Sequence, residues 1–268
     1  MFKSIIYYNE KLIYQYGSLI SESFKYDIEK VIEENDKGFG LSGGIGGVSA
    51  NFKHNGKKGV QGNIRKNVNL TYSEFESALN NERGDSYFDF VDYDPKDEYQ
   101  DLEYIGRNKI ARVEGTFLIP EEFDIMHMIG ENKNILMASF PMEDKDDEAI
   151  FKNMLSKENT LVPLKLELPF PEKNLKAFCK ANIENFLIDF DAIDDYENDD
   201  MVFLFKTNGI KKVNNSNGKI VFDIIKDFFG ISRAIRRQIK DGDQTLDGLE
   251  DIRMTEDYIE IELIAIYR

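Results

Sequence analysis

The chain has 268 residues, of which 41% are hydrophobic and 12% aromatic, enough to bury a core as one large domain or two small ones. Its 50 acidic and 34 basic residues give a net charge of −16, which argues against a protein that coats nucleic acid with its whole surface. One cysteine excludes an intramolecular disulfide, and two histidines far apart in sequence leave too few ligands for structural zinc.

The N-terminus lacks a secretory signal pattern, and no apolar run approaches the ~18–20 residues of a membrane-spanning helix. We therefore expect a cytoplasmic protein without a membrane-spanning helix. Cys179, in LKAFCKANI, suits a reducing compartment and is expected to be a small buried thiol rather than a nucleophile. No motif for a cofactor is found, so none is expected.

The first elements are a strand at 4–8 and a helix. Asn9 is the expected N-cap of this helix, whose apolar residues recur at helical spacing and could extend the stripe to about Asn35. The next segment, Lys37–Lys66, holds nine of the nineteen glycines, and no acid occurs from Lys37 to Ser73. Asn55-Gly56 is a hairpin turn signal, which indicates a long β-hairpin with arms near 40–53 and 58–70.

Three interpretations of this glycine-rich segment stay open. It can be a surface loop or hairpin, or a membrane-inserting hairpin, although neither face of the hairpin is consistently apolar. It can also bind an anion or a partner, because glycine lets backbone N–H groups approach a phosphate. The candidate cations are Lys53, Lys57, Lys58, Arg65 and Lys66. Gly38, Gly40 and Gly43 match G-x-G-x-x-G, but a helix rather than a strand is expected before them, so a dinucleotide site is not predicted.

Further elements follow in order along the chain. Ser73-Glu74-Phe75-Glu76 is a capping-box pattern that predicts a helix starting there. Strands are expected at 87–93, 109–119 and 134–140, with a helix after Pro120. Pro141–Glu148 is the predicted boundary, at about 141–147, between an N-terminal region at 1–140 and a C-terminal region at 148–268.

The second region is expected to begin with a helix near 150–155 and a strand at 161–168. A helix at 171–181 and strands at 185–190, 201–207 and 219–222 come next. A helix to about Lys240 follows, and strands at 245–254 and 258–267 are predicted to pair as a hairpin across Thr255–Asp257. Because strands and helices do not alternate regularly, the fold class is α+β, with mixed, mainly antiparallel sheets and packed helices.

Two charged features of the second region are candidate sites. Carboxylates at 189–200 could hold Mg²⁺ or Mn²⁺ for a hydrolase or transferase, although a solvated acidic loop is the simpler interpretation. The candidate ligands are Asp189, Asp191, Asp194 and Asp195. On the helix ending near 240, a cationic stripe could bind phosphates or carboxylates, or be only a solvated helix face. It consists of Arg233, Arg236, Arg237 and Lys240.

Three stretches, IIYYNEKLIYQYGSLI, GRNKIARVEGTFLIPEEFD and the terminal IAIYR, resemble a family of uncharacterised bacterial proteins catalogued as a domain of unknown function. Asn9 stands where such proteins usually carry an acid. The resemblance implies no activity and no catalytic residue, and it suggests a role near mobile elements or antiviral defence.

These observations lead to three functional hypotheses. The first is a non-enzymatic binding, sensor or assembly protein whose glycine-rich segment engages a polyanion, such as nucleic acid, or an acidic protein face, including that of a second copy. The second is the divalent-metal enzyme that uses the carboxylates at 189–200. The third is a membrane-active effector.

Overall fold

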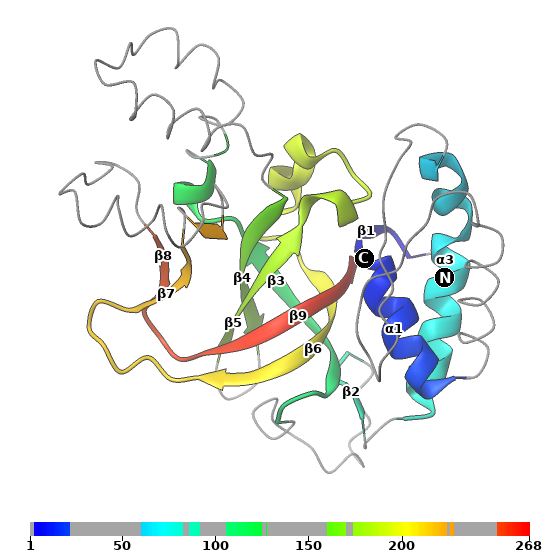
Figure 1. The fold of residues 1–268 in the computed structure, drawn as a ribbon, viewed down its shortest axis with the longest axis horizontal. Helices are drawn as coiled ribbons and strands as arrows, with labels where there is room; N and C mark the ends of the chain where they lie inside the picture. The colour runs from blue at the N-terminus through cyan, green and yellow to red at the C-terminus, as the bar shows by residue number, and fades with distance from the viewer. Residues whose placement is uncertain are drawn as a thin grey trace, which may run out of the picture.

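The computed structural model describes residues 3–21, 60–82, 86–91, 106–124, 127, 160–169, 174–223, 226–227 and 251–268. At 60–67, 169 and 174 it describes the backbone alone. The structure is of the predicted α+β class and is built around a closed five-stranded barrel (Figure 1). Among the described helices, none is both long and apolar enough to cross a membrane.

The barrel strands are β3 (Ile110–Leu118), β4 (Leu161–Pro169), β5 (Asn174–Asn182), β6 (Met201–Lys211) and β9 (Tyr258–Tyr267). Around the ring β3 pairs with β4, β4 with β5, β5 with β9, β9 with β6, and β6 with β3. All pairs are antiparallel except β5–β9. Numbered by sequence, the ring runs first, second, third, fifth, fourth, which is the Greek-key order of the OB-fold.

A helical layer covers part of the outside of this barrel. Helices α1 (Glu10–Ile20) and α3 (Val60–Asn80) lie side by side against it (Figure 1). Strand β1 (Ile5–Tyr8) pairs with the end of β9, and the short β2 (Tyr87–Asp89) runs parallel to β3. Helix α1 begins where predicted, because the Asn9 side chain accepts a hydrogen bond from the Leu12 N–H at 3.1 Å.

The remaining elements lie around the barrel away from these helices. The 3-10 helices η2 (Ile183–Asn185) and η3 (Phe190–Tyr196) connect β5 to β6. A two-stranded sheet, β7 (Lys219–Phe222) with β8 (Ile252–Met254), lies on the side opposite α1 and α3 (Figure 1). Gly218 ends the turn before β7 with φ +73°, a conformation that favours glycine.

Parts of strands β3, β6 and β9 are buried on both faces, so two apolar clusters share these strands. Alternate residues, such as Val113, Phe203 and Ile261, fill the barrel interior. Residues of the opposite parity, such as Leu204 and Ile264, meet the helical layer. The helix α3 contributes a stripe at helical spacing, all of it buried: Val68, Tyr72, Phe75 and Leu79.

Close approach of β3 to β4 explains why Gly115 lies in the middle of a strand. A Cβ placed on Gly115 would collide with the Glu167 carbonyl oxygen and with the Leu168 side chain. Glycine therefore permits the two backbones to come together at this point of the barrel.

Four predictions of which segments form strands or helices, and how they pair, were wrong. Residues 58–70 were expected to form a hairpin arm, but from Val60 the chain is the helix α3, which runs to Asn80 and buries the stripe from Val68 to Leu79. The expected helix at 171–181 is strand β5, in which Leu175, Ala177, Cys179 and Ala181 alternate with outward-facing residues. The expected strand at 185–190 carries one bridge, Tyr7 to Phe186, and then becomes η3.

The fourth wrong prediction is the terminal hairpin. β8 pairs with β7, because β9 is already flanked by β6 on one side and by β5 and β1 on the other. Strands at 4–8, 109–119, 161–168, 201–207 and 219–222 are confirmed, as is the burial of Cys179 in the barrel.

Several predicted features lie outside the described residues. These are the glycine-rich segment before Val60, the strand at 134–140, the helix near 150–155, the boundary at 141–147 and the helix at 228–240. Strands from both sides of the expected boundary, β3 and β4, pair in the same barrel. The boundary itself stays a prediction.

Candidate functional site

Arg112 is a charged residue in the middle of a strand that is otherwise buried. It lies on the outer face of β3, between Ala111 and Val113, whose side chains face the barrel interior. Only 8% of Arg112 is exposed. A guanidinium so far removed from water requires ionic and hydrogen-bonding partners, because its desolvation costs on the order of several kcal/mol.

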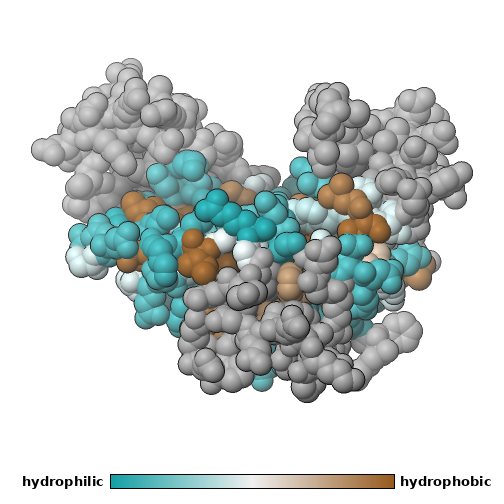
Figure 2. All heavy atoms as spheres, turned by 90° about the horizontal axis from the view of Figure 1, so that it is seen from below, coloured by the Kyte–Doolittle hydropathy of each residue, from teal (hydrophilic) through white to brown (hydrophobic). Residues whose placement is uncertain are grey.

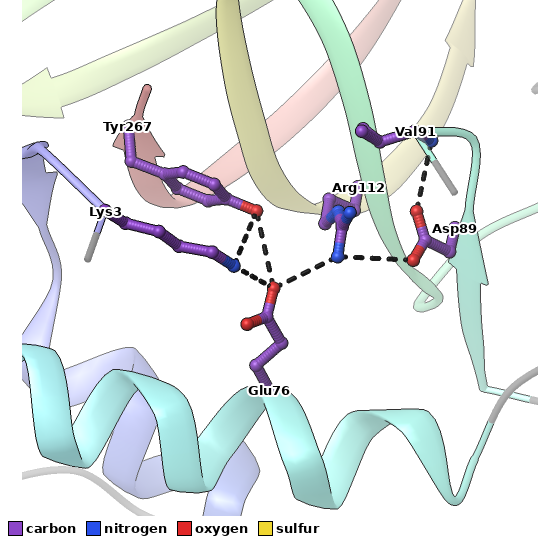
Figure 3. Close-up of polar contacts among 6 residues, drawn as sticks. All are labelled: Lys3, Glu76, Asp89, Val91, Arg112 and Tyr267. Carbon is purple, nitrogen blue, oxygen red and sulfur yellow. Dashed lines mark hydrogen bonds and ion pairs between the residues drawn. The ribbon is translucent and has the colours of Figure 1, made fainter. Parts of the chain in front are cut away.

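Two carboxylates from other elements supply those partners (Figure 3). The Arg112 Nη1 atom lies 3.1 Å from Glu76 Oε1 on α3 and 3.3 Å from Asp89 Oδ2 on β2. Asp89 is itself 1% exposed, and its Oδ1 atom accepts a hydrogen bond from the Val91 N–H at 3.1 Å. Arg112 therefore ties α3 and β2 to the barrel.

Glu76 is shared with two further groups (Figure 3). Its Oε1 atom accepts a hydrogen bond from Lys3 Nζ and lies 3.5 Å from the Tyr267 hydroxyl on β9. The Lys3 ammonium also lies 4.4 Å from the centre of the Tyr267 ring. We name these five residues, Lys3, Glu76, Asp89, Arg112 and Tyr267, the Arg112 cluster.

The Arg112 cluster joins α3, β2, β3 and β9 of the fold. Its two positive and two negative side chains balance. Burial raises the pKa of the Tyr267 hydroxyl, so the hydroxyl stays protonated near neutral pH. The cluster fixes where α3 lies on the barrel.

A second group of titratable residues lies at one end of the barrel. Burial, followed by the neighbouring carboxylates Asp194 and Glu197, raises the pKa of Asp124 from 3.8 to about 6. His127 stacks on Phe123, with ring centres 6.0 Å apart, and meets the edge of Phe190 at 5.2 Å. Here the carboxylates of η3 come close to the turn that follows β3.

The predicted metal ligands form an exposed acidic face beside this group. Asp189 caps η3, and the other three lie on it; all four side chains are exposed. They are Asp189, Asp191, Asp194 and Asp195. Within the described ranges, no group of three or more His, Cys, Asp or Glu side chains is placed to hold a metal ion.

The predicted basic residues are only partly covered by the structure. Arg65 and Lys66 lie in α3, within the part whose backbone alone is described. The other candidates of the glycine-rich segment, Lys53, Lys57 and Lys58, lie outside the described residues. The same holds for the stripe of Arg233, Arg236, Arg237 and Lys240.

The Arg112 cluster was not found from the sequence, although one signal was present. Arg112 interrupts the apolar strand KIARVEGTFLI, and a charge at such a position indicates a buried ion pair. Glu76 was assigned to a capping box at a helix start near Ser73. This assignment was wrong, because the helix already begins at Val60 and Glu76 lies well inside it. Its partners Lys3 and Arg112 are too distant in sequence for spacing rules to connect them.

Comparison with known proteins finds one family. A family model described as Domain of unknown function (DUF6414) matches residues 2–267. No curated protein and no solved structure matches the chain.

Replacing Glu76 by Gln should destabilise the fold by about 2–4 kcal/mol, because Arg112 and Lys3 would lose the carboxylate they share. Chemical denaturation measures this change. Glu167→Gln is the matched control: Glu167 pairs with Lys176 on the surface, and the loss should stay below about 1 kcal/mol. Equal losses would mean that the Arg112 cluster is no more than a surface ion pair.

The Asp124 carboxyl should make stability fall as pH rises from about 4 to 6. The pKa of Asp124 is raised on folding, from 3.8 to about 6. Between these two pH values the folded state keeps a proton that the unfolded state has released, so stability falls as pH rises. Above about pH 6 the carboxyl is ionised in both states, and the loss of stability is complete. The melting temperature of the wild type minus that of Asp124→Asn should therefore drop by about 1–3 °C between pH 4 and pH 7, since solvent screens a partly exposed group. Glu256→Gln, at an exposed residue, is the control. A difference that stays constant or rises with pH would contradict this assignment.

Proposed function

The chain belongs to the DUF6414 family, a domain of unknown function, and we propose that it is a non-enzymatic binding and assembly protein. Its basic, glycine-rich segment engages an acidic protein face, and the acidic face at 189–200 of a second copy is its partner. The exposed carboxylates on η3 are the observation that carries this proposal.

These carboxylates lie on a firmly attached element. Ile193 anchors η3 in the barrel core with 1% exposure, and the Asn198 N–H donates to the Phe117 carbonyl oxygen at 3.1 Å. Glu197 accepts a hydrogen bond from the Ile119 N–H. The negative charges are therefore held in a fixed arrangement, which reduces the entropy lost when a cationic partner binds.

Few described cations neutralise this face. Among the described residues, Arg268 forms an ion pair with Asp199 at the end of this acidic face. Asp189, Asp191, Asp194 and Asp195 all stay exposed, and like charges on one short element repel one another. A cationic partner would relieve that repulsion, and opposite charges across an interface also accelerate association.

The same chain contains a complementary segment. Lys37–Lys66 carries six basic residues and no acid, whereas the whole chain has a net charge of −16. Its last part enters α3, which the Arg112 cluster holds against the barrel. A basic segment that continues into a fixed helix can present its charges to another copy without disturbing the barrel.

Binding to a polyanion such as nucleic acid is less well supported. In barrels of this strand order, the second and third strands commonly form the binding face. Here the Lys176 and Lys180 side chains on β5 already pair with Glu167 and Asp227. The aromatic rings on that side, Phe178 and Tyr258, are 3% and 5% exposed, so they offer little surface for stacking against bases.

The proposal predicts assembly that is sensitive to salt. Asp191→Asn, Asp194→Asn and Asp195→Asn combined should lower the oligomeric mass of the protein without lowering its melting temperature, because these side chains are exposed. Lys53→Gln, Lys57→Gln, Lys58→Gln and Arg65→Gln combined should have the same effect. Light scattering after size exclusion, at about 0.05 M and about 0.5 M salt, should show the wild-type assembly dissociate at the higher concentration.

The control removes the same number of acids elsewhere. Glu74→Gln, Glu114→Gln and Glu256→Gln alter exposed residues on α3, β3 and the turn before β9, and should leave the mass unchanged. Unchanged mass in both test variants would contradict self-assembly. Salt-sensitive binding of a labelled DNA strand that only the basic variant loses would favour the polyanion instead.

A further inference from the structure

Two buried tyrosine hydroxyls lie beside the Arg112 cluster. Tyr87 on β2 is 0% exposed and Tyr72 on α3 is 1% exposed. The Tyr87 hydroxyl has no hydrogen-bond partner among the residues that the structure describes, and the Tyr72 hydroxyl has there only a long contact with the Tyr267 hydroxyl, outside ordinary hydrogen-bond distance. A buried hydroxyl left without a partner destabilises the folded state, and native proteins rarely retain one.

The surroundings of both hydroxyls are polar. Burial raises the pKa of Tyr87, and nearby Asp89 raises it further while Arg112 opposes this. Burial also raises the pKa of Tyr72, followed by the effects of Tyr267 and Glu76. Both side chains belong to one buried cluster, in which the Tyr72 ring centre lies 5.2 Å from that of Tyr267 and Tyr87 lies on the same face of β2 as Asp89. The two hydroxyls thus share one charged environment between α3, β2 and the end of β9.

The geometry points to an internal hydration site between α3 and β2, where bound water forms hydrogen bonds with the hydroxyls of Tyr87 and Tyr72 at the border of the Arg112 cluster. Buried water in proteins typically makes about three hydrogen bonds to such polar groups. This inference is independent of the proposed function.

Water fits this place better than an ion does. The charged side chains nearby, Lys3, Arg112, Glu76 and Asp89, already balance. An added anion would face two carboxylates, and an added cation would face Arg112 and Lys3. A neutral molecule that both donates and accepts hydrogen bonds matches two hydroxyls that can do either.

Replacing Tyr87 by Phe tests the site by the sign of its effect. If water satisfies the hydroxyl, Tyr87→Phe removes a hydrogen bond and should raise the unfolding equilibrium constant about three- to tenfold. If the hydroxyl is dry and unpaired, its removal should lower that constant, because an unpaired polar group leaves the interior. A more stable Tyr87→Phe variant would therefore overturn the proposal.

The double variant tests whether both hydroxyls bind the same water. If they do, Tyr72→Phe with Tyr87→Phe should raise the unfolding constant by less than the product of the two single effects. Tyr16→Phe is the positive control, because the Tyr16 hydroxyl donates to Glu262 at 2.6 Å and its removal must destabilise the fold.

A crystal structure of the wild type at high resolution provides a second measurement that does not depend on any variant folding. It should contain an ordered water within about 3.2 Å of the Tyr87 hydroxyl. Absence of such a water at well-defined side chains would overturn the proposal.

Discussion

Burial of the Arg112 guanidinium determines how the outer layer meets the barrel. Because Arg112 lies on the outer face of a strand covered by helices, its charge must be compensated by groups from those same layers. Glu76 and Asp89 do so, and they come from elements that flank β3 on different sides. The position of α3 is thus set by a directional ionic contact in addition to non-directional apolar burial.

This contact matters because apolar packing alone does not fix the position of α3 along the barrel strands. The burial of the stripe from Val68 to Leu79 against β6 and β9 is non-directional, so it defines the position of α3 along these strands less sharply than an ionic contact does. A charge pair at 3.1 Å does not tolerate a shift of α3 along these strands. Other cross-strand pairs also occupy the outer surface of the barrel: Lys206–Glu262, which contacts Tyr16 of α1, and Lys211–Glu260. Figure 2 shows one face on which hydrophilic side chains dominate, with hydrophobic ones in small separate groups.

The sequence predicted local features well and pairings poorly. The Asn9 cap and the strands with continuous apolar runs, such as β3, β4 and β6, depend on neighbouring residues and were confirmed. The helix expected at 171–181 failed because LKAFC fits helical spacing as well as the alternation that the barrel selects. The partners of β8, and those of Arg112, are separated by tens of residues, so no local pattern indicates them. The acidic face was identified as a charge run, whereas its exposure and its attachment through Ile193 required the structure.

The functional account rests on charge distribution, because a barrel of this order is compatible with many activities. Carbodiimide cross-linking of a mixture of ¹⁴N- and ¹⁵N-labelled protein tests it most directly, since this reagent joins only carboxylates and amines that touch. The account predicts mixed-isotope peptides that link Lys53, Lys57 or Lys58 of one copy to carboxylates at 189–200 of another. Cross-links that join these two regions only within single chains, or that leave the acidic face unmodified by lysine, would contradict it.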